Sequence, residues 1–238
     1  MNKRNYSKEA ELIISKELQD QKVPRLLLHS CCAPCSSHCL EFLREYFDVT
    51  VFYYNPNITE QAEYEYRMHE EQRLIKAYND QVLAMQGGAA PEEAFSGMHS
   101  SSAARLIHMI DAPYDPEHYL EAVKDMEELP EGGDRCTVCF GLRLRRTAEE
   151  AAAGGYDYFT TTLTISPLKD AERLNRIGEA LAEQVGVAWL PSDFKKKEGY
   201  KRSIELSKQF DLYRQNYCGC VFSRREREKE NAAERLAK

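Results

Sequence analysis

Apolar runs alternate with amphipathic segments along most of the chain. Short apolar runs rich in leucine, β-branched or aromatic residues predict buried strands over 25–29, 49–54, 158–163 and 187–190. Apolar residues at helical spacing predict helices over 5–22, 37–46, 60–79, 117–128, 137–153 and 171–185, and again after Ser203. Because the strands are separated by helices, we predict an α/β fold with an open, mainly parallel sheet flanked by helices.

The stretch from about 80 to 135 is the hardest part of the pattern to interpret. Glycine, alanine and proline over 87–91 and serines over 100–102 suggest an insertion, and the run 107–110 suggests the end of a strand. The 238 residues suit one domain. We expect a core over about 24–222, the charged N-terminal helix 5–22, a helical C-terminal part and a charged tail over 223–238.

Composition narrows the location and the partners. No apolar run approaches the roughly 18 residues of a membrane helix, and the charged first 20 residues have no signal-peptide core. We therefore expect a cytoplasmic protein without a membrane partner. The net charge of −7 argues against indiscriminate binding to nucleic acid. However, residues 195–229 carry 11 Lys and Arg against 5 Asp and Glu. This stretch is either a solvated helix face or a docking surface for a polyanion.

Eight cysteines are the unusual feature of the composition, and disulfides are rarely structural in a reducing compartment. They fall in three groups: Cys31, Cys32, Cys35 and Cys39; Cys136 and Cys139; and Cys218 and Cys220. The first group follows a predicted strand as a loop, where α/β proteins place functional residues. The second lies just before a predicted helix, and in the third Gly219 allows a tight turn.

Four interpretations of these cysteines compete. Structural zinc would use two Cys-x-x-Cys knuckles, and a thiol–disulfide catalyst with redox-active cysteines would need one such motif and leave six residues unexplained. Inert buried cysteines would be scattered. An iron–sulfur cluster accepts thiolates from separated segments, and surplus thiolates could hold a second metal or act on a substrate. We favour the cluster and expect Cys39 to pack in the core.

Six blocks of sequence together resemble the QueH family of epoxyqueuosine reductases, which catalyse the last step of tRNA queuosine synthesis. The blocks are Leu28 to Cys35, Tyr54 to Ile58, Glu65 to Met68, Arg135 to Leu144, Thr160 to Lys169, and Tyr217 to Cys220. The resemblance implies an adenine-nucleotide-hydrolase-like (HUP-like) fold that does not use ATP. It also implies an oxidoreductase that reduces the epoxide of epoxyqueuosine in tRNA, with an external electron donor.

The resemblance further implies a [4Fe–4S] cluster and an adjacent iron ion, which in the family is held by two cysteines and an aspartate. Cys35 stands where some relatives carry that aspartate. The candidate metal ligands are Cys31, Cys32, Cys35, Cys136, Cys139, Cys218 and Cys220, of which the first three are also candidate catalytic residues. Spacing does not divide them between the two metals. We expect adjacent Cys31 and Cys32 to point in different directions, with one on each metal.

Candidate substrate-binding residues surround the same predicted strand ends. They are Tyr54, Asn55, Asn57, Thr161, Thr162, Thr164, Ser166, Lys169, Arg135 and Arg143. Asparagines can read a base edge and a tyrosine can stack on it, although a capped turn would use the same residues. The hydroxyls could line a pocket or simply end a strand. The three cations are candidate contacts to phosphate or ribose, and the run Lys195 to Lys197 is a candidate contact to the anticodon stem. His29 is the one histidine beside the site.

Two other functions remain open at this stage. The first is a structural-zinc or metal-binding RNA-interaction protein without catalysis. The second is an ATP-using tRNA thiolase of similar topology. Such thiolases carry a glycine-rich SGGxDS phosphate loop, whereas His29 to Pro34 occupy that place here, without a glycine.

Overall fold

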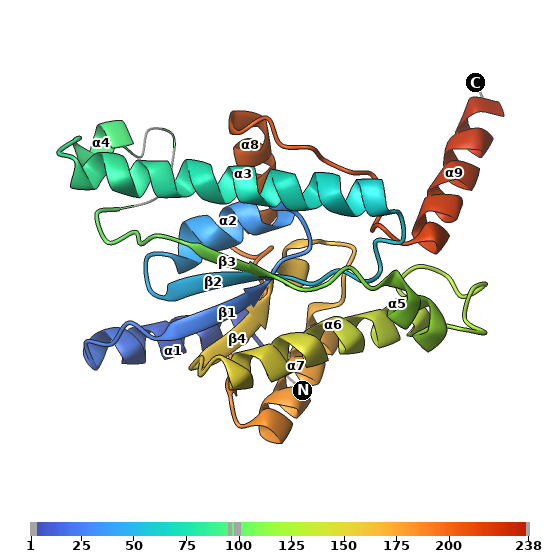
Figure 1. Ribbon diagram of the computed structural model, residues 1–238, viewed down its shortest axis with the longest axis horizontal. Helices are drawn as coiled ribbons and strands as arrows, with labels where there is room; N and C mark the ends of the chain where they lie inside the picture. The colour runs from blue at the N-terminus through green and yellow to red at the C-terminus, as the bar shows by residue number, and fades with distance from the viewer. Residues whose placement is uncertain (1–3, 95–96, 98–100, 237–238) are drawn as a thin grey trace.

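A five-stranded parallel sheet forms the centre of the molecule. The computed structural model describes residues 4–94, 97 and 101–236 (Figure 1). The strands are β1 (Arg25–His29), β2 (Asp48–Tyr53), β3 (His108–Asp111), β4 (Tyr158–Thr161) and β5 (Ala188–Trp189). They lie in the order β3-β2-β1-β4-β5, and every neighbouring pair is parallel. The predicted α/β class with an open parallel sheet is confirmed.

Helices cover both faces of this sheet. They are α1 (Tyr6–Gln19), α2 (Ala33–Leu43), α3 (Gln61–Gln86), α4 (Pro91–Ala94), α5 (Pro116–Ala122), α6 (Asp134–Ala153), η1 (a 3-10 turn, Thr162–Ile165), α7 (Ala171–Val185), α8 (Gly199–Gln209) and α9 (Val221–Leu236). Leu26 and Leu28 of β1 pack towards α1, α2 and α3, whereas Leu27 packs towards α6 and α7. This alternation produces three layers (Figure 1).

Two helices begin earlier than the sequence pattern predicts. Helix α2 starts at Ala33 instead of residue 37, since the amides of Cys35 and Ser36 already bond to the carbonyl of Cys32. Helix α6 starts at Asp134 instead of residue 137. Cys35 therefore lies in a helical turn and not in a loop, and Cys136 and Cys139 lie inside α6 and not before it.

Much of the difficult stretch 80–135 is regular structure. Helix α3 continues to Gln86, seven residues beyond its predicted end, and β3 forms one edge of the sheet. Helix α5 ends at Ala122 instead of residue 128, and the predicted strand 158–163 ends at Thr161 in the turn η1. The predicted serine-rich stretch begins at Ser100, which lies outside the described residues.

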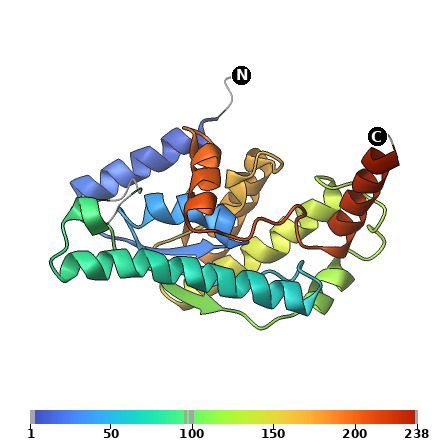
Figure 2. The same ribbon diagram turned by 90° about the horizontal axis from the view of Figure 1, so that it is seen from above.

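The C-terminal helix α9 projects from one end of the molecule (Figures 1 and 2). Its first two turns are anchored, because Phe222 is buried against Tyr119 of α5 and Cys139 of α6, and Glu226 pairs with Arg135 of α6. The rest of the helix is charged and largely exposed. In the part of the chain that the structure describes, no helix is both long and apolar enough to cross a membrane.

Candidate metal centre

Three cysteines converge at the carboxyl end of β1. The Sγ atoms of Cys31, Cys32 and Cys35 all lie within 4.8 Å of one another, and those of Cys31 and Cys32 are 3.8 Å apart. The expectation that adjacent Cys31 and Cys32 point apart is therefore wrong. The early start of α2 explains the cluster, because its first turn carries Cys35 back over the two cysteines that follow the strand.

Hydrogen bonding couples these three thiols. Hydrogen bonds from Cys32 and Cys35 lower the pKa of Cys31 well below its usual range. The same hydrogen bonds raise the pKa values of the two donors. The bond to Cys31 raises the pKa of Cys32 to about 12, and the bond to Cys31 together with burial raises the pKa of Cys35. One thiolate is thus shared by two thiols. A thiophilic metal ion would displace both remaining protons, so these three sulfurs fit a single metal ion, such as iron.

A second group of cysteines comes from two distant segments. Cys136 and Cys139 stand on α6, and Cys218 and Cys220 precede α9. Burial raises the pKa of Cys136, and raises that of Cys139 to about 12; the charge of Cys218 adds to both effects. The four thiols therefore share one neighbourhood.

Among the described residues, only Cys31, Cys32 and Cys35 form a group of three or more that lies close enough together to hold one metal ion, so this second group does not form such a site. The thiolate ligands of a four-iron cluster bind four different iron atoms, so they are spaced more widely than the ligands of one ion. Cys139 and Cys220 are buried together with Phe222, whereas Cys136 and Cys218 are partly exposed. The turn needs glycine, since Gly219 has φ +120° and a Cβ there would stand 2.9 Å from Ile58 Cγ1.

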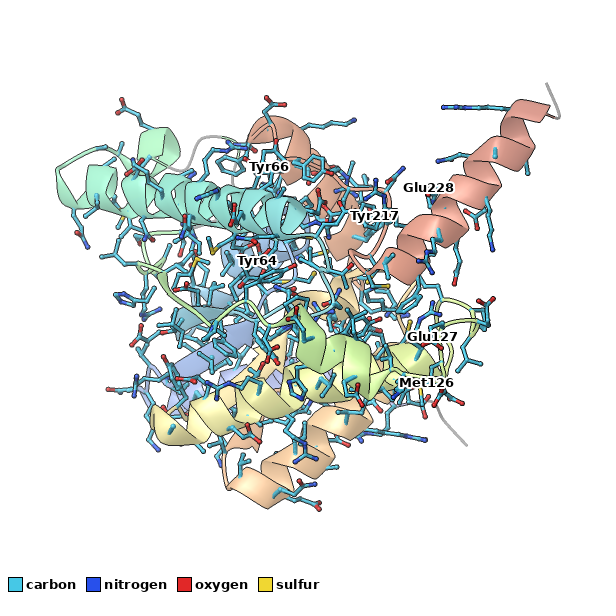
Figure 3. All side chains as sticks on the ribbon, turned by 45° about the vertical axis from the view of Figure 1, so that its right-hand side comes forward. Tyr64, Tyr66, Met126, Glu127, Tyr217 and Glu228 are labelled. Carbon is cyan, nitrogen blue, oxygen red and sulfur yellow. The ribbon has the colours of Figure 1, made fainter. Side chains whose placement is uncertain are left out.

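One cavity of about 180 Å³ joins the two groups. Cys31 and Cys35 line it from one group and Cys218 from the other. Its remaining lining is rich in cations and apolar groups: Pro34, Arg67, Glu131, Arg143, Leu163, Ile165, Ser166, Leu168, Lys169, Tyr200, Ser203, Arg214, Gln215, Asn216, Tyr217 and Arg227. Figure 3 shows Tyr217 between α3 and the base of α9. Any molecule in this cavity would be close to both thiol groups.

Arg143 lines the cavity and interacts with thiols of both cysteine groups. Its Nη2 donates to Asn55 Oδ1 (2.6 Å), and Asn55 Nδ2 donates to the carbonyl of Ser30, next to Cys31. Burial alone would lower the pKa of Arg143, but the thiolates of Cys139, Cys31 and Cys218 raise it overall. Its Nη1 is buried and has no hydrogen-bond partner among the described residues. A buried cation facing both groups is what a centre of negatively charged thiolates requires.

His29 is a neutral bridge beneath the same site. Burial, reinforced by the charge of Arg143, lowers its pKa to about 3. Arg143 Nε donates to His29 Nε2 (3.2 Å), which leaves His29 Nδ1 to donate to Thr161 Oγ1 (2.8 Å). The histidine thus links α6, β1 and β4 and holds no free donor towards the cavity.

Sequence comparisons agree with this arrangement. The model of the family described as "Epoxyqueuosine reductase QueH" matches residues 26–226. A protein of that name from Staphylococcus epidermidis is 40% identical over 221 residues, which cover 92% of this chain and 84% of the relative. Relatives from Streptococcus pyogenes serotype M1 (36% identity; 92% and 78% coverage) and Thermotoga maritima (34%; 87% and 94%) carry the same name. The chain belongs to the QueH family. The resemblance that its sequence blocks indicated is confirmed.

The structure separates the predicted substrate residues of this QueH family member into two sets. Ser166, Lys169 and Arg143 line the cavity. The others are not among its lining residues: Tyr54, Asn55, Asn57, Thr161, Thr162, Thr164 and Arg135. Thr162 Oγ1 accepts from the amide of Cys31 (3.3 Å), so it shapes the cysteine loop. The assignment of both sets to substrate binding stays a prediction.

Arg135 has a structural position at the base of α9. Its guanidinium donates to the carbonyls of Met126, Glu127 and Leu129 and forms an ion pair with Glu226 (3.1 Å). Figure 3 shows Met126 and Glu127 near the end of α6 that faces α9. Arg135 thereby fastens the loop after α5 and the first turns of α9 to α6, and so supports the second cysteine group.

Among the cavity residues that were not predicted from the sequence, two contact the cysteine segments directly. Gln215 Nε2 lies 2.9 Å from Cys32 Sγ, and Arg67 Nη1 donates to the carbonyl of Cys218 (3.2 Å). Gln215 precedes the Cys-Gly-Cys turn by three residues, which is the only signal that pointed to it. Arg67 is one of many charged residues on α3, and no local pattern distinguishes it.

The eighth cysteine and the basic run lie away from the cavity. Cys39 is fully buried in the core, and its thiol donates to the carbonyl of Cys35 (3.3 Å), in agreement with the predicted packing role. In the basic run, Lys195 pairs with Asp193 and Lys197 with Glu11. None of the residues 195–197 lines the cavity.

Proposed function

We propose that this chain reduces the epoxide of epoxyqueuosine in tRNA to the alkene of queuosine. The family assignment supports this oxidoreductase activity. The observation that carries the proposal is the cavity itself, because it places a substrate against thiols of two potential redox-metal sites at once. A non-catalytic zinc protein would have no use for a cavity bordered by both groups.

The two thiol groups suggest a division of cofactors. We propose that Cys136, Cys139, Cys218 and Cys220 hold a [4Fe–4S] cluster. Cys31, Cys32 and Cys35 would hold the adjacent iron, because their sulfurs are close enough to bind one ion. When bound, the cluster would supply electrons one at a time and the iron would polarise the epoxide oxygen as a Lewis acid.

The reaction consumes two electrons and two protons, and it releases the epoxide oxygen as water. An external donor must therefore deliver the electrons. The chain's own residues bind and orient the substrate: Leu163 and Ile165 offer an apolar wall, and Tyr200 and Tyr217 offer rings for stacking. Cys31 and Cys218 fix where the reacting carbon–oxygen bonds must lie.

The size of the cavity indicates how tRNA would bind. About 180 Å³ admits at most one nucleoside and excludes a paired helix, so the modified nucleotide must enter after leaving its stack. Exposed Arg214 and Asn216 line the cavity, as does Leu168, which is 76% exposed. We propose that these residues contact the anticodon loop around the extruded nucleotide.

Nucleoside analysis of tRNA tests the activity. Cells that lack this protein and any other epoxyqueuosine reductase should accumulate epoxyqueuosine. The wild-type gene should restore queuosine, and Cys32→Ala and Cys136→Ala should not. Cys39→Ala is the matched control and should restore it, because Cys39 belongs to the core. Normal queuosine in the deletion strain would contradict the proposal, as would a colourless protein holding stoichiometric zinc.

A further inference from the structure

Lys169 directs its charge at a single sulfur atom. Its Nζ lies 3.4 Å from Cys218 Sγ, and no other hydrogen-bond or ion-pair partner of this ammonium is found among the described residues. The turn before it fixes the geometry, since the amide of Lys169 donates to the carbonyl of Ser166 (3.2 Å). Sequence alone predicts that Lys169 contacts phosphate or ribose, but the structure points it at a cysteine.

The two buried arginines of the cavity have different partners. Arg143 donates to His29 and Asn55, and Arg67 donates to Glu63 Oε1 (2.7 Å) and to the carbonyl of Cys218. Both guanidiniums therefore also hold protein structure together. Among the described residues Lys169 makes one side-chain hydrogen bond, to a thiol, so it can be exchanged without breaking a second hydrogen bond.

We propose that Lys169 is a positioning residue that raises the reduction potential of the iron–sulfur centre through its contact with the Cys218 sulfur. This inference rests on the proposed function, in which Cys218 is a cluster ligand. Each electron taken up makes the centre more negative, so a nearby positive charge favours the reduced state. Because Lys169 is partly buried, solvent screens this attraction less than it would screen a surface pair.

Three other charged or titratable groups interact with Lys169. Glu131, the one acidic residue in the cavity lining, also interacts with Lys169, and Arg143 opposes it as a like charge. Cys31 of the other thiol group lies within range of the same ammonium. Lys169 and Arg143 both act on Cys31 and Cys218, but of these two cations only Lys169 makes a hydrogen bond to the Cys218 sulfur.

The test is the midpoint potential, measured by anaerobic spectroelectrochemistry on protein whose iron and sulfide content is determined first. Lys169→Met removes the charge and keeps the length of the side chain, and Lys169→Arg keeps the charge. We expect a more negative potential for the methionine variant and a potential near wild type for the arginine variant. Lys76→Met is the matched control, because Lys76 is exposed on α3 and pairs only with Asp80. Its potential should equal that of the wild type.

Each contrary outcome has a distinct meaning. A Lys169→Met protein that holds its cluster at the wild-type potential overturns the inference and leaves the proposed function intact, as does weaker tRNA binding with an unchanged potential. If Lys169→Met loses the cluster, Lys169→Gln takes its place in the measurement. Loss of the cluster from both neutral variants also overturns the inference, since Lys169 would then serve assembly. A wild-type chain without any cluster overturns the proposed function itself.

Discussion

The two thiol groups are built in different ways. Cys31, Cys32 and Cys35 lie within one strand–helix turn, so local backbone geometry brings their sulfurs together. The other four thiols come from α6 and from the turn before α9, and only tertiary packing joins them. The first group should therefore tolerate changes in distant parts of the fold, whereas the second should depend on the docking of α9.

The largest effect should come from removing one ligand of each group. We expect Cys32→Ala and Cys218→Ala both to abolish epoxide reduction, because the proposed reaction uses both metals. Only Cys218→Ala should lose most of the visible absorption, since the cluster dominates that spectrum. Equal loss of colour from both variants would show that the seven cysteines form one indivisible site.

Phe222→Ala tests the dependence of the second group on packing. Phe222 is buried beside Cys139 and Cys220, and truncating such a residue costs about 3–5 kcal/mol. We expect the cluster to be lost while the Cys31 group still binds one iron per chain. Leu181→Ala in α7 is the control, because it truncates a buried residue that does not line the cavity. If both variants lost the cluster alike, general instability would explain the loss.

A buried carboxyl group distinguishes the surroundings of the first group. Glu71 of α3 is fully buried, neither of its carboxyl oxygens has a hydrogen-bond partner among the described residues, and burial raises its pKa to about 8. The folded chain therefore keeps a proton that the unfolded chain loses above about pH 4.5. Stability from this group is complete at acid pH and falls as the pH rises towards 8.

Glu71→Gln should remove that pH dependence. Relative to wild type, we expect the free energy of unfolding of the variant to increase by about 3–4 kcal/mol between pH 5 and pH 8.5. Urea unfolding at several pH values measures this difference, with Glu65→Gln, at an exposed position on the same helix, as the comparison. Parallel stability curves for wild type and Glu71→Gln would contradict the assignment of the buried proton.

The smallest effect should come from Cys39→Ala. This thiol is in the core and outside both groups, so we expect a stability loss of about 1 kcal/mol with unchanged iron content and activity. A loss of iron in this variant would make Cys39 part of the first group.

The sequence predicts elements well where both pattern and cap are present. Helix α7 begins where predicted, after Asp170, whose side chain accepts from the amide of Arg173, and β1 has its predicted bounds. Helices α2 and α6 begin early because their caps, Cys32 and Gly133, provide no side-chain hydrogen bond that could signal a start. Those two errors affected the thiol groups directly, since each placed cysteines outside a helix.

The cysteines themselves could be found from their clustering, but their partners could not. Gln215 reaches Cys32, and Arg67 reaches the turn at Cys218, only because distant segments pack together. Likewise, the polar ends of β2 suggested substrate contacts at Asn55, yet its amide is occupied by Ser30 and Arg143. Such contacts depend on tertiary distances, which residue type and spacing do not encode.

We propose that seven thiols form two metal sites around one cavity, one for a cluster and one for a single iron. Mössbauer spectroscopy of anaerobically prepared, iron-57-loaded protein tests it most directly, together with iron and sulfide analysis. We expect about five iron and four sulfide per chain. One iron should be spectroscopically distinct, and it should be missing in Cys32→Ala. A single iron environment that survives in Cys32→Ala, or zinc in place of iron, would contradict it.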